Sequence, residues 1–140
     1  MTLEELWQLF PIRLTEYQPI WKEWFMEERA LLTVLLPKDV KIHPIGSTAI
    51  PGIWAKPIID MVLAVSDAAE EWSYVPPLRE QGFVLRIREP KRFEHRLLKT
   101  PHTAGHLHVF SSGCAEIDRM LVFRDWLRTH DEDRQRYEEV

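Results

Sequence analysis

The chain has 140 residues, of which 45% are hydrophobic and 29% charged, and this suits one domain over 1–140 with its own core. Its net charge of −4 excludes a broad cationic surface, so we expect no nucleic-acid binding by bulk charge. The single cysteine, Cys114, excludes an internal disulfide and suits a reducing cytoplasm. No apolar run approaches the roughly 18 residues of a membrane helix, so we expect a cytoplasmic protein that does not enter membranes.

The first part of the chain predicts two helices. Thr2 and Glu5 have the form of a capping box, which starts a short helix that Pro11 ends. A longer helix follows, in which hydrophobic residues recur with a period near 3.6. These residues are Ile20, Trp21, Trp24, Phe25, Leu31, Leu32 and Leu35. We expect this aromatic stripe to pack in the core.

Two strand-like runs come next, "VKIHPI" at 40–45 and "PIIDMVLAV" at 57–65. The second run is almost entirely apolar, which is typical of a central strand that is covered on both faces. A helix is expected over 67–78, with an interruption at Pro76 and Pro77 because proline removes a backbone donor.

The second half of the chain predicts a β-meander and a closing helix. The runs 82–88, 92–99 and 105–110 alternate in part and are separated by turn-forming residues, so we expect them to pair antiparallel. From Ala115 onward the composition is helical, with a break near 129–131. The order of elements indicates an α+β fold, a mixed β-sheet flanked by helices.

A polar turn lies between the two strand-like runs, in "HPIGSTAIPGIWAKPIID" at 43–60. Gly46 permits a backbone conformation that is closed to other residues, and Ser47 and Thr48 add hydroxyl groups beside exposed amides. Such a turn at the start of a short helix can bind a phosphate, although the same tripeptide also occurs as a simple turn or helix cap. We therefore take these residues as candidate ligands of a phosphate or nucleotide.

Asp60 is the one charged residue in the apolar run at 57–65. Burial of an unpaired carboxylate costs several kcal/mol, so this side chain needs a partner. Two explanations stay open, a structural ion pair or delivery of the carboxylate to a metal ion or a reacting hydroxyl. Lys56 precedes it by roughly 13 Å along a strand, too far for direct pairing, and either faces a phosphate or is solvated.

His106 and His108 alternate with apolar residues in "GHLHVF" and are expected on one face of their strand, about 6.6 Å apart. Two imidazoles on one face can ligate a metal, hydrogen-bond a phosphate or act as acid and base, and they can also be structural. Beside Asp60 they would complete a set of two nitrogens and one carboxylate, which suits a divalent ion such as Mn²⁺ or Zn²⁺. Arg92, next to the run at 92–99, is a candidate contact for an anion or is simply exposed.

The stretch "IGSTAIPGIWAKPIIDMVLAV" closely resembles the signature of the GrpB-like proteins, with a Gly-Ser-Thr turn and a Lys-Pro-Ile-Ile-Asp strand at this spacing. The resemblance continues in "YQPIWKEWFMEERALL" before it and in "RFEHRLLK", "GHLHVFSSG" and "LVFRDWLRTH" after it, and so covers nearly the whole chain. These proteins are grouped with the nucleotidyltransferase superfamily and resemble DNA polymerase beta in fold. The resemblance therefore implies a nucleotidyltransferase-like domain with a polymerase-beta-like palm.

The resemblance also implies roles for particular residues. The superfamily's Gly-Ser turn holds nucleotide phosphates and matches Gly46 and Ser47. Its next strand carries two acids, one residue apart, that bind two divalent ions, and Asp60 matches the first of them while Val62 stands at the second. A third acid would align with the run at 105–110, which offers histidines instead. This departure argues against ordinary two-metal nucleotidyl transfer.

Three hypotheses for function remain open at this stage. The first is an enzyme, a transferase or hydrolase, that acts on a nucleotide or another phosphorylated small molecule with Asp60, His106 and His108 as catalytic or metal-binding residues and Mg²⁺, Mn²⁺ or Zn²⁺ as a possible cofactor. The second is a binding module that keeps the phosphate site without catalysis. The third is an accessory domain that binds a protein partner through exposed tryptophans, for which Trp7, Trp54 and Trp72 are candidates.

Overall fold

A computed structural model describes residues 14–101 and 105–139 of the chain. The short helix that we expect between Thr2 and Pro11 and the candidate Trp7 lie outside the described residues. The helices are α2 (Ile20–Leu35), α3 (Val75–Glu80), α4 (Ala115–Thr129) and α5 (Asp131–Glu139), with short 3-10 helices η1 (Ser47–Ala49) and η2 (Glu71–Ser73). The strands are β1 (Lys41–Ile45), β2 (Ile59–Val65), β3 (Val84–Glu89), β4 (His95–Lys99) and β5 (Gly105–Ser111).

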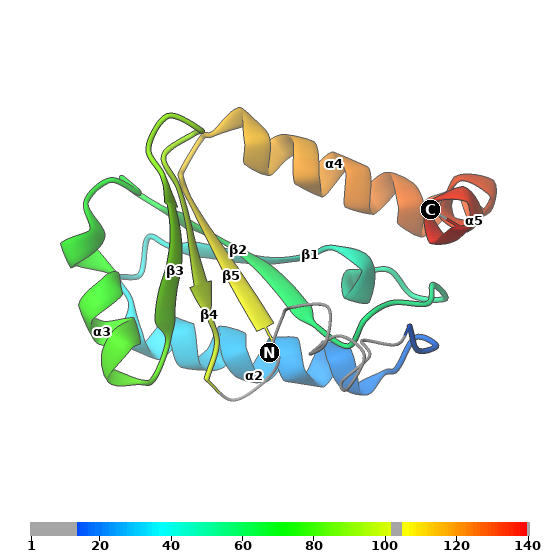
Figure 1. Cartoon of the computed structure of the whole chain (residues 1–140), viewed down its shortest axis with the longest axis horizontal. Coiled ribbons are helices and arrows are strands. Elements are labelled where there is room, and N and C mark those ends of the chain that lie inside the picture. The colour runs from blue at the N-terminus through cyan, green and yellow to red at the C-terminus, as the bar shows by residue number, and fades with distance from the viewer. Residues whose placement is uncertain (1–13, 102–104, 140) are drawn as a thin grey trace, which may run out of the picture.

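The five strands form one mixed sheet in the order β1-β2-β5-β4-β3. Strands β3, β4 and β5 pair antiparallel, which confirms the predicted meander, and β5 then pairs parallel with β2. Helices α2 and α3 cover one face of the sheet, while α4 runs along the other (Figure 1). This is the predicted α+β arrangement, and it puts β2 and β5 side by side at the centre of the sheet.

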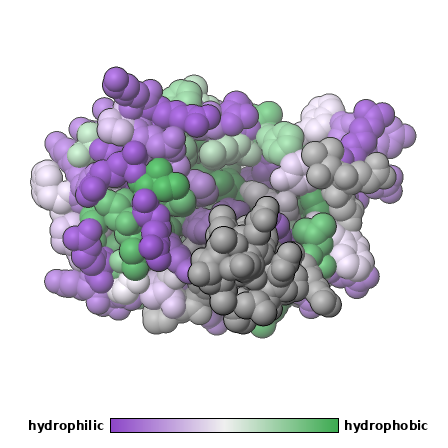
Figure 2. Space-filling model, viewed as in Figure 1, coloured by the Kyte–Doolittle hydropathy of each residue, from purple (hydrophilic) through white to green (hydrophobic). Residues whose placement is uncertain are grey.

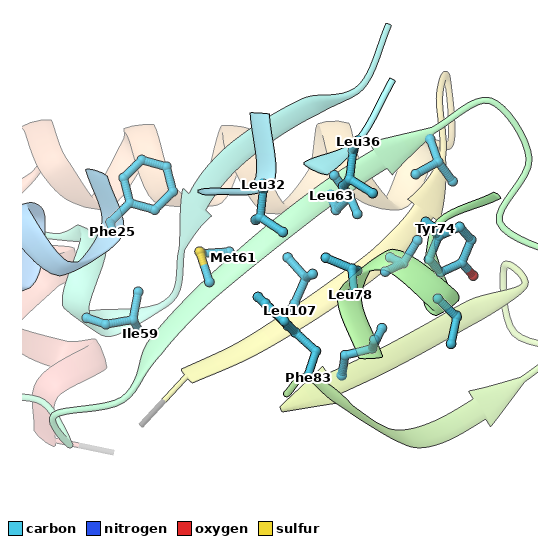
Figure 3. Packing of buried hydrophobic residues seen from close by; sticks show 14 of the residues in the cluster. Phe25, Leu32, Leu36, Ile59, Met61, Leu63, Tyr74, Leu78, Phe83 and Leu107 are labelled. Atoms are coloured by element: carbon cyan, nitrogen blue, oxygen red, sulfur yellow. The ribbon is translucent and has the colours of Figure 1, made fainter. Parts of the chain in front are cut away.

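Alternation along β2 and β5 divides the core into two layers. Met61 and Leu63 of β2 and Leu107 of β5 are fully buried toward α2 and α3 (Figure 3). On the opposite face Val62 and other apolar residues pack with Ile117 of α4. Because α4 covers one end of this face, the polar residues at the start of β2 and β5 stay partly exposed.

The predicted stripe of α2 is core, since Trp21, Phe25 and Leu32 are buried against the sheet. Ile20, at the first position of the helix, is the exception and is 43% exposed. The predicted break at the end of the chain is also present, because His130 separates α4 from α5.

The segment between β2 and β3 differs from the expectation of an interrupted helix over 67–78. The chain forms η2 first, and α3 then begins at Val75 with Pro76 and Pro77 in its first turn. The first amides of a helix have no intrahelical partner, so proline is tolerated there and does not break the helix. The two prolines thus lie at the start of α3, whereas we predicted that they would interrupt a helix.

The coloured part of the face shown in Figure 2 is mostly hydrophilic, with hydrophobic side chains gathered over β3 and β4. Val84 and Ile87 of β3 are exposed there, and Arg86 and Arg88 alternate with them on this edge strand. Trp72 of η2 is 74% exposed, as the accessory-domain hypothesis expects, and Trp54 is 46% exposed. No helix within 14–101 and 105–139 has the length and apolar character needed to cross a membrane.

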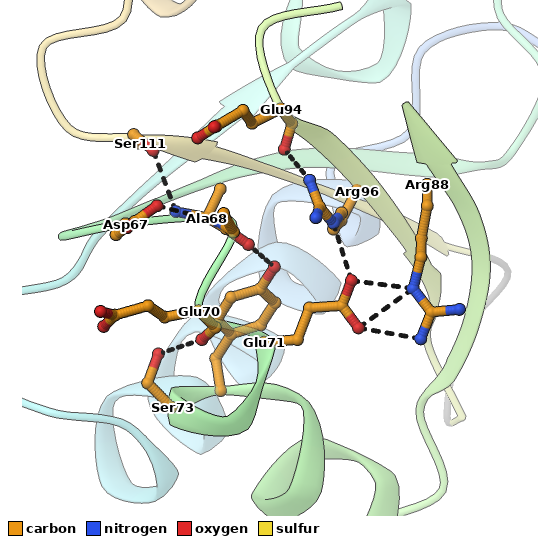
Figure 4. A network of polar contacts seen from close by, with 11 residues as sticks. Asp67, Ala68, Glu70, Glu71, Ser73, Arg88, Glu94, Arg96 and Ser111 are labelled. Atoms are coloured by element: carbon orange, nitrogen blue, oxygen red, sulfur yellow. Dashed lines mark hydrogen bonds and ion pairs between the residues drawn. The ribbon is translucent and has the colours of Figure 1, made fainter. Parts of the chain in front are cut away.

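A network of charged groups ties η2 to β3 and β4 (Figure 4). Arg88 donates two parallel bonds to the Glu71 carboxylate at 2.8 Å, and Arg96, which is buried, donates to the same carboxylate at 2.9 Å. Arg96 also donates to the carbonyl of Glu94 at 2.6 Å. Glu94 and Phe93 both have positive φ, so Arg96 stabilises a strained turn between β3 and β4.

Loss of the Glu71 carboxylate is expected to destabilise the fold. Hydrogen bonds from Arg88 lower the pKa of Glu71 to about 2 from 4.5; burial opposes this, and Arg96 adds to the lowering. We predict that Glu71→Gln reduces the free energy of unfolding by about 2 kcal/mol at pH 7, because the guanidinium groups of Arg88 and Arg96 lose a charged acceptor and face an amide with only one acceptor oxygen. Urea denaturation measures this, with Glu70→Gln on the neighbouring exposed residue as the control.

Comparison of the wild type with Glu71→Gln also predicts a difference in how stability depends on pH. A lowered carboxyl pKa stabilises the fold fully above the unfolded value of about 4.5, and that contribution is lost as the pH falls toward 2. The wild type should therefore lose more stability than Glu71→Gln between these pH values. Parallel pH profiles for the two proteins would show that Glu71 has no stabilising ion pair.

Candidate functional site

The site begins where β1 ends, at a close contact between Gly46 and Asp60. Ile45 pairs with Asp60 across β1 and β2, so the chain turns at Gly46 directly beside the carboxylate. Gly46 has φ 75° and ψ −174°, a conformation that is essentially restricted to glycine. A Cβ at this position would lie 3.0 Å from Oδ2 of Asp60. Glycine is thus required here by its backbone and by the carboxylate.

The two hydroxyl groups of the turn have different surroundings. Thr48 is buried, and its Oγ1 donates to the carbonyl of Ile58 at 3.1 Å, which ties η1 to the segment before β2. Ser47 is partly exposed, and its Oγ donates to the Tyr137 hydroxyl of α5 at 3.2 Å. Of the two predicted phosphate ligands that carry a hydroxyl group, Ser47 therefore faces the open site and Thr48 supports the turn.

Arginines of α4 and α5 hold the turn in place from the other side, a feature that our sequence analysis missed. Each donates a hydrogen bond to a backbone carbonyl at or near η1. The bonds run from Arg124 to Pro44 at 2.8 Å, from Arg128 to Ala49 at 2.9 Å and from Arg134 to Pro51 at 3.4 Å. The spacing of four between Arg124 and Arg128, which puts both on one helix face, was the available signal.

The predicted His-x-His pair lies beside Asp60. The parallel register places His106 opposite Asp60 and His108 opposite Val62. Oδ1 of Asp60 is 3.3 Å from Nδ1 of His106 and 3.6 Å from Nε2 of His108. The side chains of His106, His108 and Asp60 are 42%, 22% and 30% exposed, so a solvent-borne molecule can reach all of them.

His108 continues into a chain of polar contacts that we did not predict. Its Nδ1 lies 3.1 Å from Nε2 of His95, and Nδ1 of His95 lies 2.7 Å from Oε1 of Glu89. Burial lowers the pKa of His95, against the effect of Glu89, and the hydrogen bond from His95 lowers the pKa of Glu89. His95 lies two residues before Leu97, which pairs with His108, so the two histidines face the same side of the sheet, and this depends on a strand register that the sequence alone does not give.

Asp60 lies where two cavities meet. The larger, of about 620 Å³, is lined by Leu14, Ser47, Ile53, Trp54, Ala55, Lys56, Ile58, Asp60, His106 and Tyr137. The second, of about 480 Å³, is lined by Tyr17, Trp21, Lys22, Phe25, Met26, Pro44, Thr48, Ala49, Pro51, Ile59, Asp60 and Arg128. Both cavities combine apolar and polar residues. The first contains Ser47, Lys56 and His106, the second contains Lys22 and Arg128, and the Asp60 carboxylate is common to both.

Arg92 is not brought to either of these cavities. It lies on the turn between β3 and β4, 78% exposed, with Nη1 3.7 Å from Glu89. Together with His95 and His108 it lines a third cavity of about 270 Å³. Only His108 belongs both to this cavity and to the Asp60 cluster, so the predicted contact of Arg92 with a phosphate would need a ligand on the far side of His108.

The strand pair does not provide a two-metal site. Val62, at the position where the superfamily carries its second acid, shares a face with Asp60 but is fully buried against α4. Among the residues that the structure describes, no group of three His, Cys, Asp or Glu side chains is arranged to hold a metal ion.

Comparison with known families identifies this arrangement. The family model described as GrpB protein matches residues 11–140. The chain belongs to the GrpB family. Among its GrpB-like relatives, the UPF0157 protein BH1888 of Halalkalibacterium halodurans is 52% identical over 130 residues, which are 92% of this chain and 67% of that protein. The UPF0157 protein SCO7215 of Streptomyces coelicolor is 42% identical over 92% of this chain and 68% of its own length.

Solved structures place the GrpB fold among the nucleotidyltransferases. The crystal structure of the conserved protein GrpB from Enterococcus faecalis aligns with a TM-score of 0.73 and 29% identity over 91% of this chain and 79% of that chain. The Cid1 poly(U) polymerase, in its MgGTP-bound structure, aligns with a TM-score of 0.55 and 14% identity over 89% of this chain and 41% of that chain. The second likeness is one of fold alone, and it confirms the expected nucleotidyltransferase-like domain.

The contact between Gly46 and Asp60 can be tested by stability measurements. We predict that Gly46→Ala lowers the free energy of unfolding by about 3 kcal/mol, because it combines a strained conformation with a clash at Oδ2. Gly113→Ala is the matched control, since Gly113 also has positive φ but no atom near its absent Cβ, and it should cost about 1 kcal/mol. In an Asp60→Ala background the difference between the two substitutions should become smaller, because the contact with Oδ2 is gone. An unchanged difference would show that Asp60 does not restrict position 46.

Proposed function

We propose that this chain binds a nucleotide or a related phosphorylated small molecule at Asp60, with the phosphate in the larger cavity. The observation that carries the proposal is that Asp60 lines two cavities, of which the larger also contains Ser47, Lys56 and His106. Lys56 offers a positive charge to a phosphate, and Ser47 and His106 offer a hydroxyl and an imidazole around the same space. These groups are the usual partners of a phosphate oxygen.

The second cavity supports the choice of a nucleotide over a bare phosphate. Tyr17, Trp21, Phe25 and Arg128 contribute to its lining. Trp21 and Phe25 are largely buried, while Tyr17 is partly exposed and offers a ring on which a nucleobase can stack, with polar groups close by for the sugar and phosphate. A molecule that passes Asp60 could place its base in one cavity and its phosphate in the other.

The reaction that fits this site best is acid–base chemistry by Asp60 and the histidines. A two-metal nucleotidyl transfer needs several carboxylates, and the second acid position is occupied by Val62. His106 and His108 flank Asp60 within 3.6 Å, and an imidazole can serve as a general acid or base. A binding module without turnover uses the same contacts, and a rate measurement with Asp60→Asn separates it from an enzyme.

Calorimetry with ATP, CTP, GTP and UTP tests the phosphate site. We expect the wild-type chain to bind at least one of them, and Lys56→Ala to weaken this binding about tenfold because a charge-assisted contact is lost. Arg92→Ala is the matched control and should change the affinity less than about twofold, since Arg92 lines neither cavity at Asp60. No binding by any of the four, or an equal loss in both variants, would contradict the proposal.

The divalent ion that our sequence analysis gives as a possible cofactor can be tested separately. With one carboxylate at the site, we predict that Mn²⁺ binds weakly, at no more than one ion per chain, and that Asp60→Asn removes this binding. Titration followed by electron paramagnetic resonance counts the free ion directly. Tight binding of two ions per chain would contradict the interpretation that Val62 stands where a second acidic metal ligand is missing.

A further inference from the structure

Four polar side chains form a continuous line across the sheet from the rim of the third cavity to Asp60. Glu89 and His95 are 2.7 Å apart, and His95 and His108 are 3.1 Å apart, both within hydrogen-bond range. The last step, from Nε2 of His108 to Oδ1 of Asp60, is 3.6 Å. The first two contacts are therefore hydrogen bonds, while the last is too long to be one.

The order of donors along this line is fixed by its first member. An ionised carboxylate only accepts hydrogen bonds, so Nδ1 of His95 must donate to Glu89. In a neutral imidazole the other nitrogen is then an acceptor, so Nε2 of His95 accepts a hydrogen bond that the Nδ1–H of His108 donates. Nε2 of His108 is left with a lone pair that faces the carboxylate of Asp60. Two facing acceptors explain why this distance exceeds a hydrogen bond.

We propose that Asp60 and His108 together accept one hydrogen-bond donor, a hydroxyl or amino group, of the bound phosphorylated molecule, and that Glu89 and His95 are positioning residues that keep Nε2 of His108 free of hydrogen. This deepens the proposed function and rests on it. The substrate class is thereby narrowed to phosphorylated molecules that carry a hydroxyl or amino group near the phosphate. A sugar hydroxyl of a nucleotide has this chemistry.

The other charged groups near the two histidines have different partners. Arg119 and Glu116 of α4 pair with each other, and Arg92 pairs with Glu89. His106 turns its Nδ1 toward Asp60. Phe110 packs on the His95 ring, with centroids 4.9 Å apart, and keeps it in place. Glu89 is therefore the group that sets the hydrogen positions along the line.

Nitrogen-15 NMR of the imidazole rings tests the positioning role. At pH 8 the spectrum of the wild-type chain should show His108 with hydrogen on Nδ1 and a bare Nε2. Glu89→Leu and His95→Phe should move a large part of the His108 population to the form with hydrogen on Nε2, which Asp60 can then accept. His95→Phe keeps an aromatic ring against Phe110, so it also serves if Glu89→Leu folds poorly. Glu116→Leu removes an acid from the same cavity and should change nothing.

A pair of phosphates tests the donor contact. Glycerol 3-phosphate and propyl phosphate differ only in two hydroxyl groups, and we expect the wild type to bind the first about tenfold more tightly. His95→Phe should reduce this ratio to about twofold without weakening propyl phosphate, because only the hydroxyl contact is lost. Glu116→Leu should keep the wild-type ratio.

Each result decides a different point. Hydrogen on Nε2 of His108 in the wild type, or the same form in all variants, overturns the positioning role of Glu89 and His95. Equal affinity of the wild type for the two phosphates overturns the donor contact. If neither phosphate binds, the proposed function and the donor contact fail together, while the NMR result still decides the role of the positioning residues.

Discussion

The parallel pairing of β2 with β5 is the constraint on which the site depends. It sets Asp60 opposite His106, with His108 two residues further along β5. All three lie on the face of the sheet that α4 covers only in part. A shift of one residue would turn the carboxylate into the layer packed by α2, where an unpaired charge costs several kcal/mol. The buried residues Met61, Leu63 and Leu107 therefore fix the position of the site as firmly as its own contacts do.

The turn before β2 is adapted to the same carboxylate. Gly46 lets Asp60 approach the backbone, and Thr48 and the arginines of α4 and α5 bind the backbone around the turn. Helices from the end of the chain thus shape a site whose polar residues come from its middle. Val62 belongs to this adaptation, because it packs with Ile117 where the superfamily has an acid, and a carboxylate there would be buried under α4.

The sequence predicted those parts that follow from periodicity. The stripe of α2, the central strand β2, the meander and the shared face of His106 and His108 all come from patterns with a fixed repeat, and each is present. Contacts between residues that are far apart in the sequence could not be predicted from such patterns. Nothing in the local pattern shows that Arg124 reaches a carbonyl on β1, or that Arg92 lines the third cavity and not those at Asp60. The pairing of His95 with His108 required the strand order, which local sequence does not encode.

The most direct test of the account is to map where a phosphorylated molecule binds, using amide chemical shifts during titration with ATP. We predict that the amide signals of Gly46, Ser47, Lys56 and His106 shift together and saturate. The signals of Arg92, Arg119 and the exposed residues of β3 should not change. Shifts confined to the third cavity, or spread over α4 without any at Gly46 and His106, would contradict the claim that Asp60 and its neighbours form the binding site.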